Sequence, residues 1–402
     1  MLGSGLTAAG QAVNEIERDL TTAANAYGAP DARIAALPTF IIVALDPTRP
    51  ATLEPTRQIG GMRLDQTSEL YQTLRLAREA RIEPAEGTRR VLDAVAMKPR
   101  FGIAVTLAGH VLMTVGICLL QRPTWQAVVL AAGFGLLVGG LRVVAAGNAR
   151  ADTLMPVLAS FVVASITFML ADEGWANRQV SALVAPLVAF LPGAALTMAV
   201  IELAAGAIVT GTSRLIAGGM RLVFLAAGIA AAAQAVGPVK PGVVPHQSPL
   251  LPAWIPWAGA AVFGLGVVLY QSAPRGSVLP LFAVLLTAFV GQQIGAALFG
   301  SIAGAFLGAL AMTPMARLVE RTANGPPMLV SFLPAFWLLV PGALGLRSVT
   351  AYLGAQNTAA INDFLGTIGA MIAISLGVLL GYPVASAVVG AQRLTIGKYL
   401  HP

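Results

Sequence analysis

Apolar runs long enough to cross a lipid bilayer recur through residues 101–402 and decide what this chain can fold into. A bilayer core roughly 30 Å thick is crossed by about 20 apolar helical residues. Since 56% of all residues are hydrophobic and only 11% are charged, a water-soluble fold could not cover so much apolar surface. The sequence therefore predicts an all-α polytopic membrane protein.

Charged residues and prolines divide the apolar runs into about ten predicted spans. With residues 1–100 in the cytosol, eleven of the Lys and Arg residues from Lys98 onward fall on the cytosolic side and four on the outer side. Cytosolic loops carry such an excess of positive charge, so both termini are predicted to be cytosolic. The predicted spans are 101–120, 124–145, 153–171, 181–211, 215–236, 253–271, 278–296, 298–316, 326–346 and 363–390.

Residues 1–100 differ from the rest because they hold twelve basic and twelve acidic residues, so the net charge of +7 lies entirely beyond them. The sequence predicts that these residues form a small α+β domain. Because no basic, apolar signal peptide begins the chain, we expect the domain to lie in the cytosol. Apolar spacing, Gly and Pro predict three helices and two paired strands. The helices are expected at 13–27, at 65–80 and from Pro84, and the strands at 39–45 and 51–60.

The membrane part predicts two five-helix repeats, 101–236 and 253–402, on either side of the Pro-rich loop 237–252. An odd number of spans in each copy makes the copies run in opposite senses through the bilayer. Inverted repeats with broken helices at matching positions are typical of secondary transporters. The matches are Gly116 with Gly266, Gln121 with Gln271, Pro123 with Pro274, Val138-Gly139 with Val290-Gly291, and Phe190-Leu191-Pro192 with Phe332-Leu333-Pro334.

The stretch 181–211 is too long for one straight span, since its residues would extend about 46 Å as a helix. We expect it to split or kink at Pro192-Gly193, and the second copy carries Pro334 and Pro341-Gly342 at comparable places. A split would offer free backbone groups to a polar solute near the middle of the membrane. The alternative is a proline kink that only shapes helix packing.

Glu202 is the only carboxylate well inside a predicted span. A membrane carboxylate is costly and marks a functional site by default, here a proton carrier or a ligand for an amine. The alternative is a structural ion pair with Arg214 or with an Arg of another helix.

Further polar or aromatic residues are weaker candidates for a solute or proton pathway. Each could instead make a contact within or between helices, or mark the end of a span. These candidates are Thr197, Ser213, Arg214, Gln292, Gln293 and Trp337.

Other classes of function find little support in the sequence. The basic residues are scattered singly at the ends of apolar runs, so no nucleic-acid surface is predicted. Cys118 is the single cysteine, and no metal-ligand cluster or nucleotide loop predicts a metal or a cofactor. The expected partners are a small polar metabolite, protons and the lipid bilayer, and assembly into a homo-oligomer stays open.

Several separated motifs resemble the threonine/serine exporter family. The run FLPGAALTMAVIELAAGAIVTGTSRL (190–215) is similar to its central signature, and FLPAFWLLVPGALGL (332–346) to its C-terminal one. YGAPDARIAALPT (27–39) and the segment 65–87 resemble the N-terminal region. The resemblance implies an exporter of small amino acids in the bacterial cytoplasmic membrane, driven by the proton gradient. The resemblance also extends to relatives that export dicarboxylates.

We therefore expect a proton-antiporting exporter of threonine, serine or a similar metabolite, and no enzymatic activity. Export of a dicarboxylate such as succinate is the first alternative. A membrane enzyme with a catalytic N-terminal domain and a passive channel or scaffold are alternatives of other classes. No nucleophile set supports the enzyme.

Overall fold

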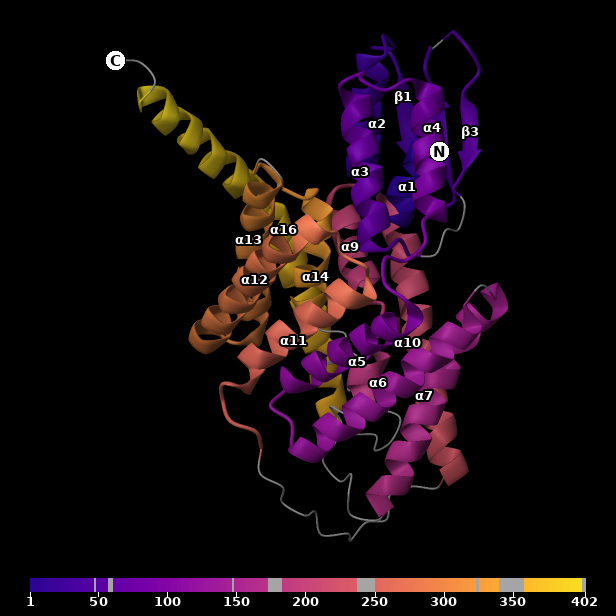
Figure 1. The fold of residues 1–402 in the computed structure, drawn as a ribbon, viewed down its shortest axis with the longest axis vertical. Helices are drawn as coiled ribbons and strands as arrows, with labels where there is room; N and C mark the ends of the chain where they lie inside the picture. Colours follow the sequence, from indigo (N-terminus) through magenta and orange to yellow (C-terminus); the bar gives the residue numbers. More distant parts are fainter. Residues whose placement is uncertain are drawn as a thin grey trace.

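The computed structural model has an N-terminal head on a larger helical membrane part, with α9 directly beneath the head (Figure 1). In chain order the head is α1, α2, a three-stranded sheet, α3 and α4. The residues that the structure describes are 1–46, 48–56, 61–146, 148–172, 183–236, 250–322, 325–339 and 358–399.

The predicted helices and strands of the head are confirmed, and α1 and β1 are additions. β2 is apolar and β-branched, and it lies between β1 and β3 in an antiparallel sheet that pairs Ile41 with Glu54. Buried Leu6, Ile16 and Leu70 join α1, α2 and α3 to Ile41 in one core. The elements are α1 (Leu2–Ala8), α2 (Val13–Ala26), β1 (Arg33–Ala36), β2 (Phe40–Ala44), β3 (Thr52–Pro55), α3 (Leu64–Arg78) and α4 (Pro84–Ala96).

All the regular secondary structure in the described residues of the membrane part is helical. Its first half contains α5 (Ile103–Leu119), α6 (Trp125–Ala145), α7 (Ala149–Asp172), the 3₁₀ helix η1 (Ala185–Phe190), α9 (Gly193–Ala204) and α10 (Ile208–Val236). Its second half contains α11 (Ile255–Tyr270), the 3₁₀ helix η2 (Arg275–Ser277), α12 (Val278–Phe299), α13 (Ser301–Glu320), α14 (Met328–Leu339) and α16 (Thr358–Tyr399).

Six of these helices are long and apolar enough to cross a membrane, namely α6, α7, α10, α12, α13 and α16. The other four expected spans correspond to shorter apolar helices, α5, α9, α11 and α14. Large apolar side chains on the long helices are exposed, among them Val129, Ile216 and Leu279. A multi-pass membrane protein explains this exposure, because lipid would cover these side chains.

The two halves meet where α5 crosses α11, and glycines make this crossing close. A Cβ added at Gly116 would lie 2.4 Å from the backbone nitrogen of Phe263, and one added at Gly266 would lie 2.3 Å from that of Met113. Small residues allow helices in membranes to approach in this way. The expected match of Gly116 with Gly266 therefore falls on the contact that joins the halves.

The contacts at this crossing occur in matched pairs. Gly109 faces Tyr270, and Gly259, which follows Gly109 by 150 residues, faces Leu120. The turns after α5 and α11 also correspond, because Arg122 (φ 49°) and Ser272 (φ 51°) both adopt the left-handed conformation. These two residues are again 150 positions apart.

Helix packing repeats between the halves in the same way. Helix α5 contacts α6 and η1, as α11 contacts α12 and α14. Helix α7 packs on α10, as α13 packs on α16.

The stretch 181–211 is split, as its length predicts, and Pro192 is the N-cap of α9. A second break follows α9, where Gly206 has a φ of 84°. Our boundary between the fourth and fifth predicted spans was wrong, because the chain reverses here and α10 already begins at Ile208. Glycine adopts this left-handed conformation at little cost, so it can end α9 inside an apolar run.

The second copy is different at the matching place. Helix α14 continues through Pro334, which lies inside it. Pro341-Gly342 and most of the loop 237–252 lie outside the described residues.

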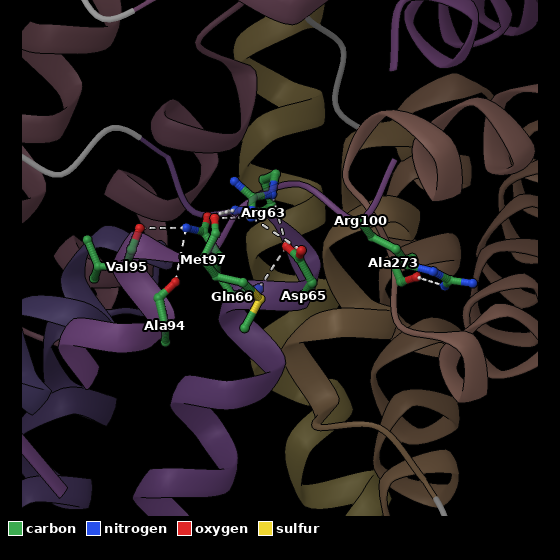
Figure 2. Close-up of polar contacts among 8 residues, drawn as sticks. All are labelled: Arg63, Asp65, Gln66, Ala94, Val95, Met97, Arg100 and Ala273. Carbon is green, nitrogen blue, oxygen red and sulfur yellow. Dashed lines mark hydrogen bonds and ion pairs between the residues drawn. The ribbon is translucent and has the colours of Figure 1, made fainter. Parts of the chain in front are cut away.

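A polar joint at the base of the head fixes the end of α4 to the start of α3 (Figure 2). The side chain of Gln66 donates to the carbonyls of Ala94 and Val95 at 3.1 and 2.9 Å, and Arg63 donates to that of Met97 at 2.7 Å. These bonds give side-chain donors to carbonyls at the end of α4, where the regular hydrogen bonds of the helix run out. Arg63 is also fixed by an ion pair with Asp65 at 3.0 Å.

Two bonds continue from this joint into the loop after α11. The backbone N–H of Leu64 donates to the carbonyl of Gln271 at 3.1 Å. Arg100 donates to the carbonyl of Ala273 at 2.9 Å, as Figure 2 shows. The start of α3 and the segment before α5 are thus both fastened to the second half.

Replacing Gly116 by Ala should destabilise the protein by about 1–3 kcal/mol, the usual cost of overpacking. The new methyl would meet the backbone of Phe263. Gly133→Ala on α6 is the matched control, because a Cβ there meets nothing within 4 Å. Thermal unfolding in detergent measures the difference, and equal midpoints for the two variants would contradict the close crossing.

Gln66→Glu should loosen the polar joint, because a carboxylate would face the carbonyls of Ala94 and Val95 in place of an amide donor. An unsatisfied buried polar group costs about 1–3 kcal/mol, so opening of the α4 end should become roughly tenfold more frequent. Trypsin cleavage after Arg100 measures this opening. Gln72→Glu, on the exposed side of the same helix, should cleave like the parent protein. Unchanged cleavage of Gln66→Glu would show that the joint does not hold α4.

Candidate functional site

A cavity of about 790 Å³ lies between the head and both halves of the membrane part. Its wall comes from the first half through α5, α6, η1, α9 and α10, and from the second half through α11, α12 and α14. The head supplies Thr7 to Gly10 together with Gly61 and Met62. A cavity of this size and position is the default candidate for a small-molecule site.

Most of the residues expected in a pathway line this cavity. They come from three separate stretches of the sequence, so the fold brings them together. They are Pro192, Gly193, Arg214, Gln292, Gln293 and Trp337.

The other expected residues lie outside the lining. Ser213 is exposed, and its hydroxyl donates to the carbonyl of Val209 in its own helix at 2.7 Å. Pro334 is buried inside α14, next to Leu333, which does line the cavity. Thr197 and Glu202 are completely buried in α9.

Glu202 is held by partners from two parts of the chain. One carboxylate oxygen, Oε2, lies 2.9 Å from Nε of Arg214, and the Glu202 side chain is 0% exposed. The other oxygen, Oε1, accepts a hydrogen bond from the backbone N–H of Val13 in the head at 3.2 Å. Arg214 in turn donates to the carbonyl of Gln11 at 3.3 Å.

The turn at Gly206 makes this ion pair possible. Along one continuous helix, Glu202 and Arg214 would lie more than three turns apart. Because the chain reverses between α9 and α10, the two side chains meet beneath the head. The structural partnership that we considered for Glu202 is therefore present. Since Arg214 also lines the cavity, the carboxylate is one contact away from a solute bound to Arg214.

Thr197 joins α9 to α16. Its carbonyl accepts a hydrogen bond from the hydroxyl of Ser375 at 3.2 Å. Its own hydroxyl is buried and has no hydrogen-bond partner in the described part of the chain. This places Thr197 at the interface between the two halves, on the side of α9 that packs on α16.

Sequence reasoning missed two cationic residues of the lining, Arg142 and Arg221. Both lie among the basic residues that the sequence scatters near the ends of apolar runs. The guanidinium of Arg142 lies over the rings of Phe190 and Tyr270, at 5.2 and 5.7 Å from their centroids. Their positions near the ends of apolar runs gave no signal that the folded chain turns them inward.

The described lining contains three arginines and no Asp or Glu. Only Arg214 among them has a carboxylate partner within the described residues. The cavity wall is thus positively charged, which favours a solute that carries a carboxylate.

A second cleft of about 790 Å³ separates α2 and α3 of the head from the end of α13. It contains Arg75, Arg78 and Arg317 together with Glu79 and Glu320. Nearby in α2, burial raises the pKa of the Glu15 carboxyl, and Arg18 offsets part of that rise. Charges of both signs compensate one another in this cleft, so it favours no single ligand.

In the part of the chain that the structure describes, no three His, Cys, Asp or Glu residues lie close enough together to hold a metal ion. His110 is buried between helices, and its Nδ1 lies 2.9 Å from the carbonyl of Gly135. It therefore joins α5 to α6.

Comparison with known families gives one match. The model described as "Putative threonine/serine exporter" (ThrE) matches residues 1–236, which is more than half of the chain. The chain belongs to the threonine/serine exporter family. No curated protein and no solved structure matches it significantly.

The family match covers the head and the whole first half, including Glu202 and Arg214. It ends before α11, so the resemblance that we noted at 332–346 lies outside it. Membership in the threonine/serine exporter family places the chain among membrane transporters.

Proposed function

We propose that this protein exports small amino acids of the threonine/serine class across the cytoplasmic membrane in exchange for protons. One observation carries the proposal: Arg214 belongs to the wall of the central cavity and is ion-paired with the buried Glu202. A proton that neutralises Glu202 would remove this ion pair and change the charge that the cavity presents to a solute. Buried membrane carboxylates serve as proton carriers in this way.

In this proposal the two halves are inverted five-helix repeats, and both termini are cytosolic. The matched contacts between α5 and α11 support the repeat, since each contact recurs with the partners exchanged. A two-fold relation requires such self-complementary pairs. The break at Pro192, beside the cavity, agrees with the broken helices that form binding sites in inverted-repeat transporters.

The zwitterion of an amino acid suits the polar part of the cavity. Arg142 and Arg221 can bind its carboxylate, and Gln292 and Gln293 offer neutral acceptors to its ammonium group. Trp337 and the surrounding apolar residues leave room for a short side chain.

Glu202→Gln should reduce gradient-driven threonine efflux from proteoliposomes to the level of empty liposomes. The amide can still accept the hydrogen bond from Val13, but it can neither carry a proton nor pair with Arg214 as an anion. The experiment follows labelled threonine with an imposed pH gradient, and size-exclusion chromatography checks the fold.

Glu320→Gln is the matched control for this prediction. Glu320 also accepts a backbone N–H, from Met328 at 2.9 Å, and lies 3.7 Å from Arg317, but it does not line the central cavity. It should leave efflux unchanged. Wild-type efflux from Glu202→Gln would refute Glu202 as the proton carrier. A passive channel is distinguished by a further comparison, because threonine flux through a channel would not depend on the imposed pH gradient.

Export of a dicarboxylate is the second candidate, and the surplus of cationic groups favours it. Arg142 and Arg221 both line the cavity without a carboxylate partner among the described residues. A four-carbon dicarboxylate could bind one guanidinium with each of its carboxylates.

The double variant Arg142→Gln/Arg221→Gln distinguishes the two solutes. A dicarboxylate would lose a contact at each end, so its efflux should fall by roughly tenfold or more for each charged hydrogen bond removed. Threonine has one carboxylate and should lose less. Proteoliposomes loaded with labelled threonine and labelled succinate measure both. If threonine efflux fell more than succinate efflux, the dicarboxylate reading would be wrong.

A further inference from the structure

We propose that the head is the cytosolic gate of the central cavity and that the Glu202–Arg214 ion pair is the latch that holds this gate shut. The inference rests on the proposed transport function and adds a task for the head, which family membership does not assign.

The head forms part of the cavity wall. The end of α1 and the turn after it contribute Thr7, Ala8, Ala9 and Gly10 to the lining. Gly10 has a φ of 86°, and it turns the chain back toward α2. A solute entering from the cytosolic side would meet this turn, so a movement of the head would widen the way into the cavity.

The latch connects this turn to the membrane part. The backbone N–H of Val13 donates to Glu202 at 3.2 Å, and the carbonyl of Gln11 accepts from Arg214 at 3.3 Å. One donor and one acceptor of the same turn thus bind the two members of a single ion pair. The contact depends on charge, because Glu202 and Arg214 orient each other at 2.9 Å.

A second attachment lies elsewhere and does not depend on that ion pair. Leu64 and Arg100 donate to backbone carbonyls of the loop after α11. If the latch opens, these bonds still hold the head to the membrane part. The head would then pivot about the start of α3 while the α1–α2 turn lifts away.

The latch belongs to one half only. Aligning Phe332-Leu333-Pro334 with Phe190-Leu191-Pro192 puts Leu344, which lies outside the described residues, at the position of Glu202. The second half therefore has no carboxylate there. A latch that is present in only one of the two repeats can control access from only one side of the membrane. In the proposed orientation this is the cytosolic side, where the head lies.

Opening by protonation gives the order that antiport requires. Among the described residues, Arg214 of the adjoining α10 is the one charged side chain that interacts electrostatically with Glu202. Helices α14 and α16 and the head place no other charged side chain near it. A proton from outside neutralises Glu202, the ion pair breaks and the gate opens to the cytosol. After a solute enters, the proton leaves to the cytosol and the pair closes the gate behind it.

Val13→Pro tests the latch with little other change. Val13 is the first residue of α2, where proline is tolerated, and Ala12 before it is already extended. The substitution removes the N–H that binds Glu202. Val13→Ala is the control, because it also shortens the buried side chain but keeps that N–H.

The readout is the labelling rate of one cysteine in the cavity wall. Cys118 is the chain's single cysteine, so Cys118→Ala gives a background in which Ala195→Cys on α9 reports access. A membrane-impermeant sulfonated thiol reagent is added to inside-out vesicles. Leu53→Cys, exposed on β3 of the head, reports that the reagent reaches the cytosolic face.

Val13→Pro and Glu202→Gln should both raise the labelling rate at Ala195→Cys by about tenfold or more, since each removes a hydrogen bond or ion pair to a charged group. Val13→Ala and Glu320→Gln should label as slowly as the parent. Equal slow labelling in Val13→Pro, Glu202→Gln and the parent would overturn the gate. So would a parent rate as fast as at Leu53→Cys. Labelling needs no solute, so a failed gate is distinguished from a failed transport function.

Discussion

The burial of one carboxylate shapes the centre of this protein. Removing a charged side chain from water costs several kcal/mol, which only close partners can offset. Glu202 obtains those partners from α10 and from the head. The reversal at Gly206, the packing of α9 on α10 and the docking of the α1–α2 turn all have to occur together for the ion pair to form. Loss of one member would leave the other charge buried, at a cost of about 3–5 kcal/mol.

The glycine crossing of α5 and α11 provides the frame around this centre. Because the two backbones nearly touch at Gly116 and Gly266, the halves are fixed relative to each other at one line of contact. The cavity lies beside that line, with Phe263 of α11 and Met113 of α5 in its wall. The crossing between the halves is fixed, the cavity lies beside it and the head lies above it. In this arrangement, access to the cavity can change on one side of the membrane at a time.

Much of this fold could be predicted from the sequence, because its signals are local. Apolar runs gave the membrane helices, and the Pro192-Gly193 pair gave the start of α9. The β-branched run at 39–45 gave β2, and Pro84 gave the start of α4. Each of these follows from composition, spacing or backbone restriction within a few residues.

The unpredicted features depend on contacts between distant segments. Gly206 lies between two alanines in an apolar stretch that predicts one helix, and the contacts between α9 and α10, the Glu202–Arg214 pair among them, form only once the chain reverses there. Arg142 has the position of a boundary charge, yet packing against Phe190 and Tyr270 turns it into the cavity. The participation of the head in the cavity wall likewise needs the docking of two separate parts.

The most direct test of the account is the movement of protons that accompanies export. Purified protein in liposomes containing a pH-sensitive dye is given an outward threonine gradient and no initial pH difference. Coupled exchange predicts that protons move against the direction of threonine, with no such signal in empty liposomes or with Glu202→Gln. Threonine efflux without any accompanying proton movement would contradict the central claim.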